Sequence, residues 1–289
     1  MNSESMRRIF PFLRWFPLNR ETVKADAIAG VTVALLLIPQ SMAYAQLAGL
    51  PPHYGLYAAF LPVLAGAMFG WCHQLQTGPV AMTSLLTAAV LAPMAIADSS
   101  RLIDLAVLLC LMIGFIRLLL GISRMSFFVN FLSHSVVVGF TNAAAIIIAL
   151  SQLGKLLGVP MGRSESFLHD VWSVAPNAGG SDLSTLLFGV SALAVMLCMR
   201  KWLPQWPGVM IAVVAATAVS WATGFPQAGA LPGIEPRIVG TIPAGLPHLR
   251  FPAFDIQTVI HLVPAAILIA LVGFAEVAAV TRAISLKTG

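Results

Sequence analysis

The chain has 289 residues, of which 58% are hydrophobic and only 9% are charged. A soluble domain carries roughly 25% charged residues, so this composition excludes an ordinary soluble protein and indicates a polytopic integral membrane protein. The net charge is +5. Because the basic residues are spread over short loops and form no patch, we expect no nucleic-acid partner.

We expect eight hydrophobic segments to lie in the lipid bilayer, and most of them have the length of about 17–25 residues that a membrane-spanning helix needs. Residues 1–26 are basic and aromatic, and we expect a cytoplasmic or interfacial segment there. The apolar run that follows is too long for a cleaved signal peptide, so the first span is expected to be retained. The spans are predicted at 27–47, 54–70, 78–93, 102–122, 128–152, 183–199, 207–223 and 257–280.

The basic residues lie unevenly between the two sides that these spans define. Eleven Lys and Arg fall on the side of the N-terminus and five on the other side, with Arg117 counted in the loop after the fourth span. Cytoplasmic loops are enriched in Lys and Arg. We therefore expect a multi-pass protein of a bacterial inner membrane or another plasma membrane, with a cytoplasmic N-terminus.

The first span is interrupted by Pro39, which Gln40 and Ser41 follow directly. Tyr44 lies four residues after Gln40, so both side chains share one helix face. A glutamine in a span can simply bond a neighbouring helix. Because Gln40 follows a proline and shares its helix face with Tyr44, a role for Gln40 in contacting substrate is at least as strong an interpretation.

The third span is short, because Gly78 and Pro79 open it and Pro93 limits it to about 22 Å of helix. This length predicts a half-helix that starts inside the membrane, with Pro79 at the first helical position. The N–H groups of Val80 and Ala81 would then form an anion site near the midplane. The alternative is an ordinary span with a Gly-Pro entry at the surface.

Glu276 is the one acid that we place inside a span. A carboxylate in the membrane is costly, so it indicates a proton carrier, a sodium ligand or a salt-bridge partner. A structural hydrogen bond to a neighbouring helix is the alternative. Val280, one turn later, offers no oxygen, which favours protons over sodium.

The six histidines and three cysteines show no metal-ligand spacing, so neither a metal nor a cofactor is expected. A membrane enzyme would need a cluster of His, Asp, Ser or Glu at one interface, and none is evident. No catalytic residue is therefore predicted, and an enzyme is a weaker interpretation than a transporter.

Three stretches closely resemble the SulP sulfate permease family, which includes sulfate transporters, bicarbonate permeases and animal anion exchangers. They are Leu37–Ala45, Leu47–Tyr57 and Gly78–Ala81, followed by Ser84-Leu85-Leu86. The resemblance covers essentially the whole chain. It implies an all-α fold of fourteen segments in two inverted repeats of seven, with the third and tenth segments as facing half-helices.

The resemblance implies that residues 27–289 are the first repeat plus the eighth helix, with the remaining spans and a STAS domain absent. It also implies a homodimer for the full-length protein. By position, Gln40 and Tyr44 correspond to substrate-contacting residues, as do Gly78, Pro79, Val80 and Ala81. Glu276 corresponds to the acid that couples transport to an ion.

The sequence departs from the family before the half-helix, where Gly70-Trp71-Cys72-His73 replaces a common Gly-Thr-Ser-Arg. The resemblance implies a secondary active transporter of inorganic anions, with sulfate foremost and proton symport favoured over sodium. Bicarbonate uptake and exchange of chloride, bicarbonate or dicarboxylates are the alternatives. A scaffold that does not transport is a more distant one.

Overall fold

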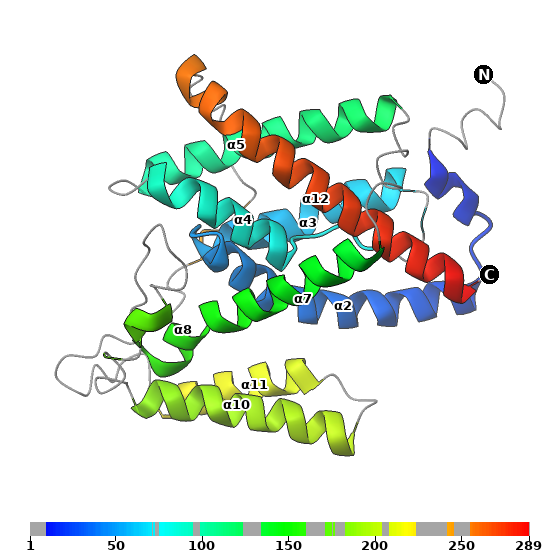
Figure 1. The fold of residues 1–289 in the computed structure, drawn as a ribbon. Coiled ribbons are helices and arrows are strands. Elements are labelled where there is room, and N and C mark those ends of the chain that lie inside the picture. The colour runs from blue at the N-terminus through cyan, green and yellow to red at the C-terminus, as the bar shows by residue number, and fades with distance from the viewer. Residues whose placement is uncertain are drawn as a thin grey trace. The chain divides into compact units, whose positions relative to one another are not determined.

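The computed structural model describes residues 10–70, 72, 75–94, 99–123, 134–159, 171–174, 176, 183–203, 208–223, 242–245 and 255–288. Throughout these ranges the regular structure is helical (Figure 1). The elements are η1 (Pro11–Trp15), α2 (Arg20–Leu47), α3 (Pro52–Phe69), α4 (Ala81–Leu91), η2 (Ala92–Met94), α5 (Ser99–Ile122), α7 (His134–Ser151), α8 (Leu153–Leu157), α10 (Leu183–Trp202), α11 (Gly208–Ala222) and α12 (Ile256–Thr288).

Every one of the eight predicted spans contains a helix. Within the described residues, α2, α5, α10 and α12 are long and apolar enough to cross a membrane. Residues 128–133 of the predicted fifth span lie outside the described residues, as does most of the loop at 224–256. Helix α2 begins at Arg20 rather than near residue 27, and α12 continues to Thr288, because a helix can extend beyond its apolar part.

The chain divides into two compact units. The first holds η1, α3, α4, α5 and α12, together with both ends of α2. The second holds α8, α10 and α11, and in it α10 packs lengthwise against α11 (Figure 1). Gly208 allows this approach, since a β-carbon built there would lie 3.0 Å from the β-carbon of Met199.

The core of the first unit lies where α4, α5 and α12 meet. Helix α12 runs across both α5 and α4 (Figure 1). Leu91 of α4, Leu109 of α5 and Leu262 of α12 are completely buried there. Burying a leucine contributes roughly 1.5–3 kcal/mol in water. These three helices therefore pack around one buried core, which fixes α4 against α5 and α12.

The turn between α2 and α3 is fixed by Gly49, which has a φ of 82°. The N–H of Leu50 donates to the carbonyl of Ala45 at 2.9 Å, and that of Gly49 donates to Gln46 at 3.1 Å. This is the Schellman arrangement, in which a residue in the left-handed region ends the helix. Pro51 follows, and α3 begins at Pro52.

Candidate functional site

Helix α4 is too short to cross a bilayer. Its 11 residues span about 16 Å at 1.5 Å per residue, against a hydrocarbon core of about 30 Å. Residues 75–80 before it have no regular structure. The predicted half-helix is therefore present, although the helix begins at Ala81 rather than at Pro79. Val80 is the N-cap with extended backbone, and Pro79 precedes it.

The first turn of α4 leaves backbone donors without a partner inside the helix. Its first hydrogen bond runs from the N–H of Ser84 to the carbonyl of Val80 at 3.1 Å. The N–H groups of Ala81, Met82 and Thr83 thus point out of the N-terminal end, as in every α-helix. Together they carry a positive partial charge.

The extended segment before α4 is held against α3. The Thr77 hydroxyl donates to the carbonyl of Pro62 at 3.3 Å. A β-carbon at Gly66 would overlap the same hydroxyl. Glycine at position 66 therefore allows the segment to lie directly on α3. The position of the segment that leads into α4 thus depends on Gly66 and on the hydrogen bond of Thr77.

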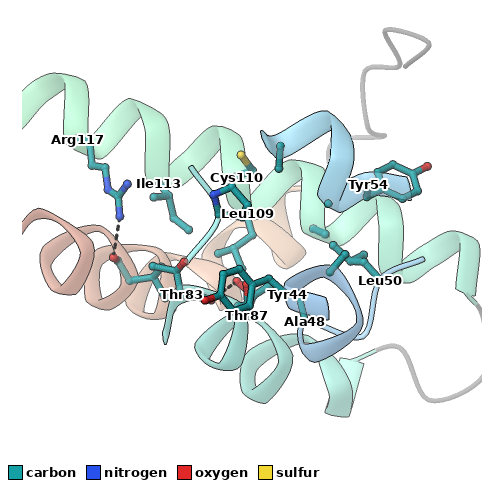
Figure 2. A pocket seen from close by; sticks show the side chains of 17 residues that line it. Tyr44, Ala48, Leu50, Tyr54, Thr83, Thr87, Leu109, Cys110, Ile113 and Arg117 are labelled. Carbon is teal, nitrogen blue, oxygen red and sulfur yellow. Dashed lines mark hydrogen bonds between the residues drawn. The ribbon is translucent and has the colours of Figure 1, made fainter. Parts of the chain in front are cut away.

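A cavity of about 270 Å³ lies beside the first turns of α4, within the first unit (Figure 2). It is formed by the end of α2, the start of α3, Pro79, α4, α5 and one residue of α12. We call it the α4 pocket. Its lining residues are Tyr44, Ala45, Ala48, Leu50, Tyr54, Gly55, Ala58, Pro79, Thr83, Ser84, Thr87, Ala106, Leu109, Cys110, Ile113, Arg117 and Ile269.

The pocket is largely apolar with a few polar groups. Thr83, Ser84 and Thr87 of α4 bring hydroxyls to it, and α5 brings the Arg117 guanidinium (Figure 2). Among the residues that the structure describes, no Asp or Glu belongs to its lining. Hydroxyls and a guanidinium can donate hydrogen bonds to an anion. The pocket is also roomy enough for a small oxyanion with several waters, at about 30 Å³ per water.

The predicted residues of the first span lie at one side of this pocket. Tyr44 lines it, and the Gln40 amide donates to the Tyr44 hydroxyl at 2.8 Å. Gln40 itself is exposed and is not part of the lining. Gly55 of α3 packs against the backbone of Ser41, where a β-carbon would overlap the Ser41 carbonyl. This contact brings the start of α3 next to the Gln40–Tyr44 face of α2.

Of the four residues predicted at the half-helix, only Pro79 lines the pocket; Gly78, Val80 and Ala81 do not. Thr83 and Thr87 face it instead, from one turn to the next. Each has a single O–H, which here donates to a carbonyl of its own helix, at 3.1 Å to Val80 and at 2.8 Å to Thr83. It must turn away from that carbonyl to donate to an anion. The sequence does contain a signal for this face, because the hydroxyl residues at 84 and 87 and at 83 and 87 are three and four residues apart and so lie on one side of a helix.

Glu276 is half-buried on α12 and does not line the pocket. It lies close enough to Arg117 for electrostatic attraction between the two side chains. Arg117 lies within α5, so its predicted place in the loop after the fourth span is wrong. Among the described residues, no three of His, Cys, Asp and Glu are grouped so as to hold a metal ion.

The fold resembles that of known transporters. A structure of SLC26A9 superposes with a TM-score of 0.86 at 24% identity, covering 99% of this chain and 48% of that one. The transmembrane domain of BicA, a cyanobacterial bicarbonate transporter, gives a TM-score of 0.76 at 22% identity, covering 89% of this chain and 64% of that one. These likenesses concern the fold alone.

Two curated relatives are more similar in sequence. A protein of Mycobacterium tuberculosis named as a probable sulfate transporter is 38% identical over 271 residues, which are 94% of this chain and 47% of the relative. Sulfate transporter 4.1, chloroplastic, of Arabidopsis thaliana is 36% identical over 282 residues, 96% of this chain and 41% of the relative. The chain thus spans less than half the length of either.

Residues 23–289 match the sulfate permease family. Together with the short α4 and its apolar neighbouring helices, this match makes the chain part of an integral membrane protein with a partial transporter fold rather than an enzyme. The chain belongs to the sulfate permease family.

Proposed function

We propose that the protein is a secondary active transporter of inorganic anions, with sulfate as its main substrate and proton symport as its driving force. The observation that carries this proposal is the α4 pocket, where the first turn of a half-helix, three hydroxyls and a guanidinium meet between apolar helices. A half-helix end near the midplane is a recurring binding site in secondary transporters.

The anion would sit beside the first turn of α4. There the partial positive charge of the helix end and the Thr83 and Ser84 hydroxyls would replace part of its hydration shell. Tyr44 would close the side of the pocket formed by α2, with Gln40 holding its hydroxyl at 2.8 Å. The role of Gly78, Val80 and Ala81 would be structural, because their backbone sets the position of this turn. The substrates named for the two curated relatives support sulfate.

Glu276 would carry the coupling proton. Neutralising its carboxylate as the anion enters would offset part of the charge brought into the membrane. Val280, one turn later, is exposed and offers no oxygen, which supports protons over sodium. Alternating access would follow from movement of one repeat-built part against the other.

The arrangement in the membrane is also a proposal. With Arg117 placed inside α5, ten Lys and Arg remain on the side of the N-terminus against five on the other. This bias supports a cytoplasmic N-terminus in a bacterial inner or other plasma membrane. The aromatic η1 packs against the end of α3, where the rings of Phe10 and Phe69 lie 5.8 Å apart, which supports an interfacial role for residues 1–26. We also propose a homodimer.

Uptake of radiolabelled sulfate into proteoliposomes of the full-length protein tests the function. An inward proton gradient is expected to drive accumulation, and excess sulfate should compete better than bicarbonate or chloride. Uptake that depends on sodium, or that proceeds only against a counter-anion, would instead support a bicarbonate permease or an exchanger. The absence of any flux would support a scaffold.

The coupling role of Glu276 is tested by Glu276→Gln in the same assay. The variant is expected to lose the response to the proton gradient while sulfate exchange at equal pH continues. Glu21→Gln, an exposed glutamate in the first turn of α2, is the matched control and should behave as wild type. An unchanged pH response in Glu276→Gln would sink the coupling role.

A further inference from the structure

Arg117 is a cation inside an apolar span. It lies in α5, within a 23-residue stretch that is hydrophobic enough to cross the membrane. Its guanidinium reaches across to α12, where Nη2 donates to the carbonyl of Ile269 at 3.5 Å (Figure 2). It also fills the space beside Gly273, because a β-carbon at that position would overlap Nη2. The glycine thus forms a notch that holds the guanidinium.

The hydrogen bonding of this guanidinium is far from complete. An arginine side chain has five N–H donors in a planar fork. With the residues that the structure describes, Arg117 makes one hydrogen bond, and its length lies at the outer limit for such a bond. The Nε atom is buried and has no partner within the described part of the chain. Because buried donors are normally paired, an acceptor is expected to complete this site.

The surroundings of Arg117 restrict what that acceptor can be. Glu276, three residues after Gly273 on α12, attracts it electrostatically but makes no hydrogen bond or ion pair with it that would saturate the fork. Cys110, two turns earlier on the same face of α5, is the other titratable group that acts on it. Helix α4 carries no ionisable side chain. Arg117 is one of the residues that line the α4 pocket, so an acceptor bound in that pocket would lie next to it.

We propose that Arg117 is the residue that selects oxyanions in the α4 pocket. The proposal rests on the proposed function and deepens it by naming the chemical class of the substrate. A planar fork can donate two parallel hydrogen bonds to two oxygens of one anion. A spherical halide offers one centre on which both N–H groups must converge, so it matches the parallel fork less well than two oxygens do. A lysine ammonium would act only as a point charge. The preference for sulfate over chloride is therefore assigned to the fork.

The backbone contact supports a fixed orientation of the fork. The Ile269 carbonyl and the Gly273 notch position the plane of the guanidinium from the α12 side. Glu276 lowers the energy of keeping the cation in the membrane when no anion is bound. In this arrangement Glu276 balances the charge of Arg117, whereas the planar geometry of the Arg117 guanidinium determines which anion binds.

The test is equilibrium binding of sulfate and chloride to the full-length protein in lipid nanodiscs. Arg117→Lys keeps the charge and the attraction to Glu276 but removes the fork. We expect its affinity for sulfate to fall by about tenfold to a hundredfold, the range for losing hydrogen bonds to a charged group. Its affinity for chloride should change less than threefold. Arg117→Gln should lower the affinity for both anions.

Arg200→Lys, at the exposed end of α10, is the matched control and should change neither affinity. Thermal stability of each variant is measured alongside, and because Arg117→Lys keeps the charge it remains informative if Arg117→Gln does not fold. An unchanged sulfate-to-chloride ratio in Arg117→Lys overturns the inference. If wild-type protein binds sulfate with the expected dependence on Arg117 but shows no proton-driven uptake, the inference stands and the proposed function fails.

Discussion

The Arg117 guanidinium lies in the space that a side chain at position 273 would occupy. These two residues are on different helices, α5 and α12, which pack against each other in the core of the first unit. A glycine in the middle of a helix is destabilising by roughly 0.5–1 kcal/mol relative to alanine. At position 273 the missing β-carbon leaves room for the Arg117 guanidinium to approach the backbone of α12.

This contact predicts the effect of Gly273→Ala. The added methyl group must displace the guanidinium, so we expect sulfate affinity to fall by about tenfold, or ~1.4 kcal/mol, without any change of charge. The matched control is Gly114→Ala on α5, where a β-carbon meets nothing within 4 Å. That variant should bind sulfate normally and be no less stable. Wild-type affinity in Gly273→Ala would show that the position of the guanidinium does not matter.

A second prediction concerns the segment that leads into α4. Gly66→Ala places a β-carbon on the Thr77 hydroxyl, which should push the extended segment away from α3. We expect sulfate uptake to fall at least tenfold, mainly through a higher KM, since a displacement of about 1 Å at a site can have a hundredfold effect. The measurement is initial uptake over a range of sulfate concentrations.

Removing the obstructing atom provides the internal control for that prediction. In the double variant Gly66→Ala with Thr77→Ala, the hydroxyl that the new methyl group meets is gone. Uptake should recover in part, although the hydrogen bond from Thr77 to the Pro62 carbonyl is lost as well. A double variant that is as poor as the two single changes combined would contradict the steric explanation.

The helices could be predicted from the sequence because each produces a local hydrophobic run. The start of α2 could not be placed, since residues 20–26 are polar yet helical and hydropathy marks the apolar part only. The half-helix was predicted from the spacing of Pro79 and Pro93. Its first residue was missed by two positions, because the pattern does not distinguish the N-cap Val80 from a first helical residue.

Arg117 could not be identified from the sequence as part of the site. A lone arginine five residues before the end of a span is compatible with a side chain that extends to the membrane surface. What places it in the pocket is a contact with Ile269, 152 positions away in the chain, and the glycine at position 273. Neither residue is unusual in an apolar span, so only the packing of α5 on α12 reveals the arrangement.

A third prediction concerns the pair formed by Gln40 and Tyr44. Tyr44→Phe keeps the ring in the pocket but removes the acceptor of the Gln40 amide, which is 2.8 Å away. A hydrogen bond of this kind contributes about 0.5–1.5 kcal/mol, so the KM for sulfate should rise roughly twofold to tenfold. Gln40→Ala should have a similar effect.

The two changes should not add, because each removes the same interaction. The double variant Gln40→Ala with Tyr44→Phe is therefore expected to resemble either single variant in KM. Gln46→Ala, an exposed glutamine on the same helix, is the matched control. Strictly additive effects would show that Gln40 acts on the substrate independently of Tyr44.

The last prediction concerns Asp255, which directly precedes α12. The Thr258 hydroxyl donates to its carboxylate at 3.0 Å and the N–H of Gln257 donates at 3.3 Å, and these bonds hold the pKa of Asp255 below its ordinary value of 3.8. A carboxyl group with a lowered pKa stabilises the folded state above its unfolded pKa. That stabilisation is lost as the pH falls through the folded pKa.

Acid should therefore loosen the start of α12 below about pH 4. Hydrogen exchange in the first turn of α12 of the full-length protein should accelerate in that range for wild type. Asp255→Asn can still cap the helix but has no charge to lose, so its exchange should not gain this acid dependence. Asp26→Asn, an exposed aspartate of α2, should behave as wild type. If Asp255→Asn and wild type respond to acid identically, the carboxylate of Asp255 does not stabilise this helix end, and the hydrogen bonds from Thr258 and Gln257 contribute nothing specific to its charged form.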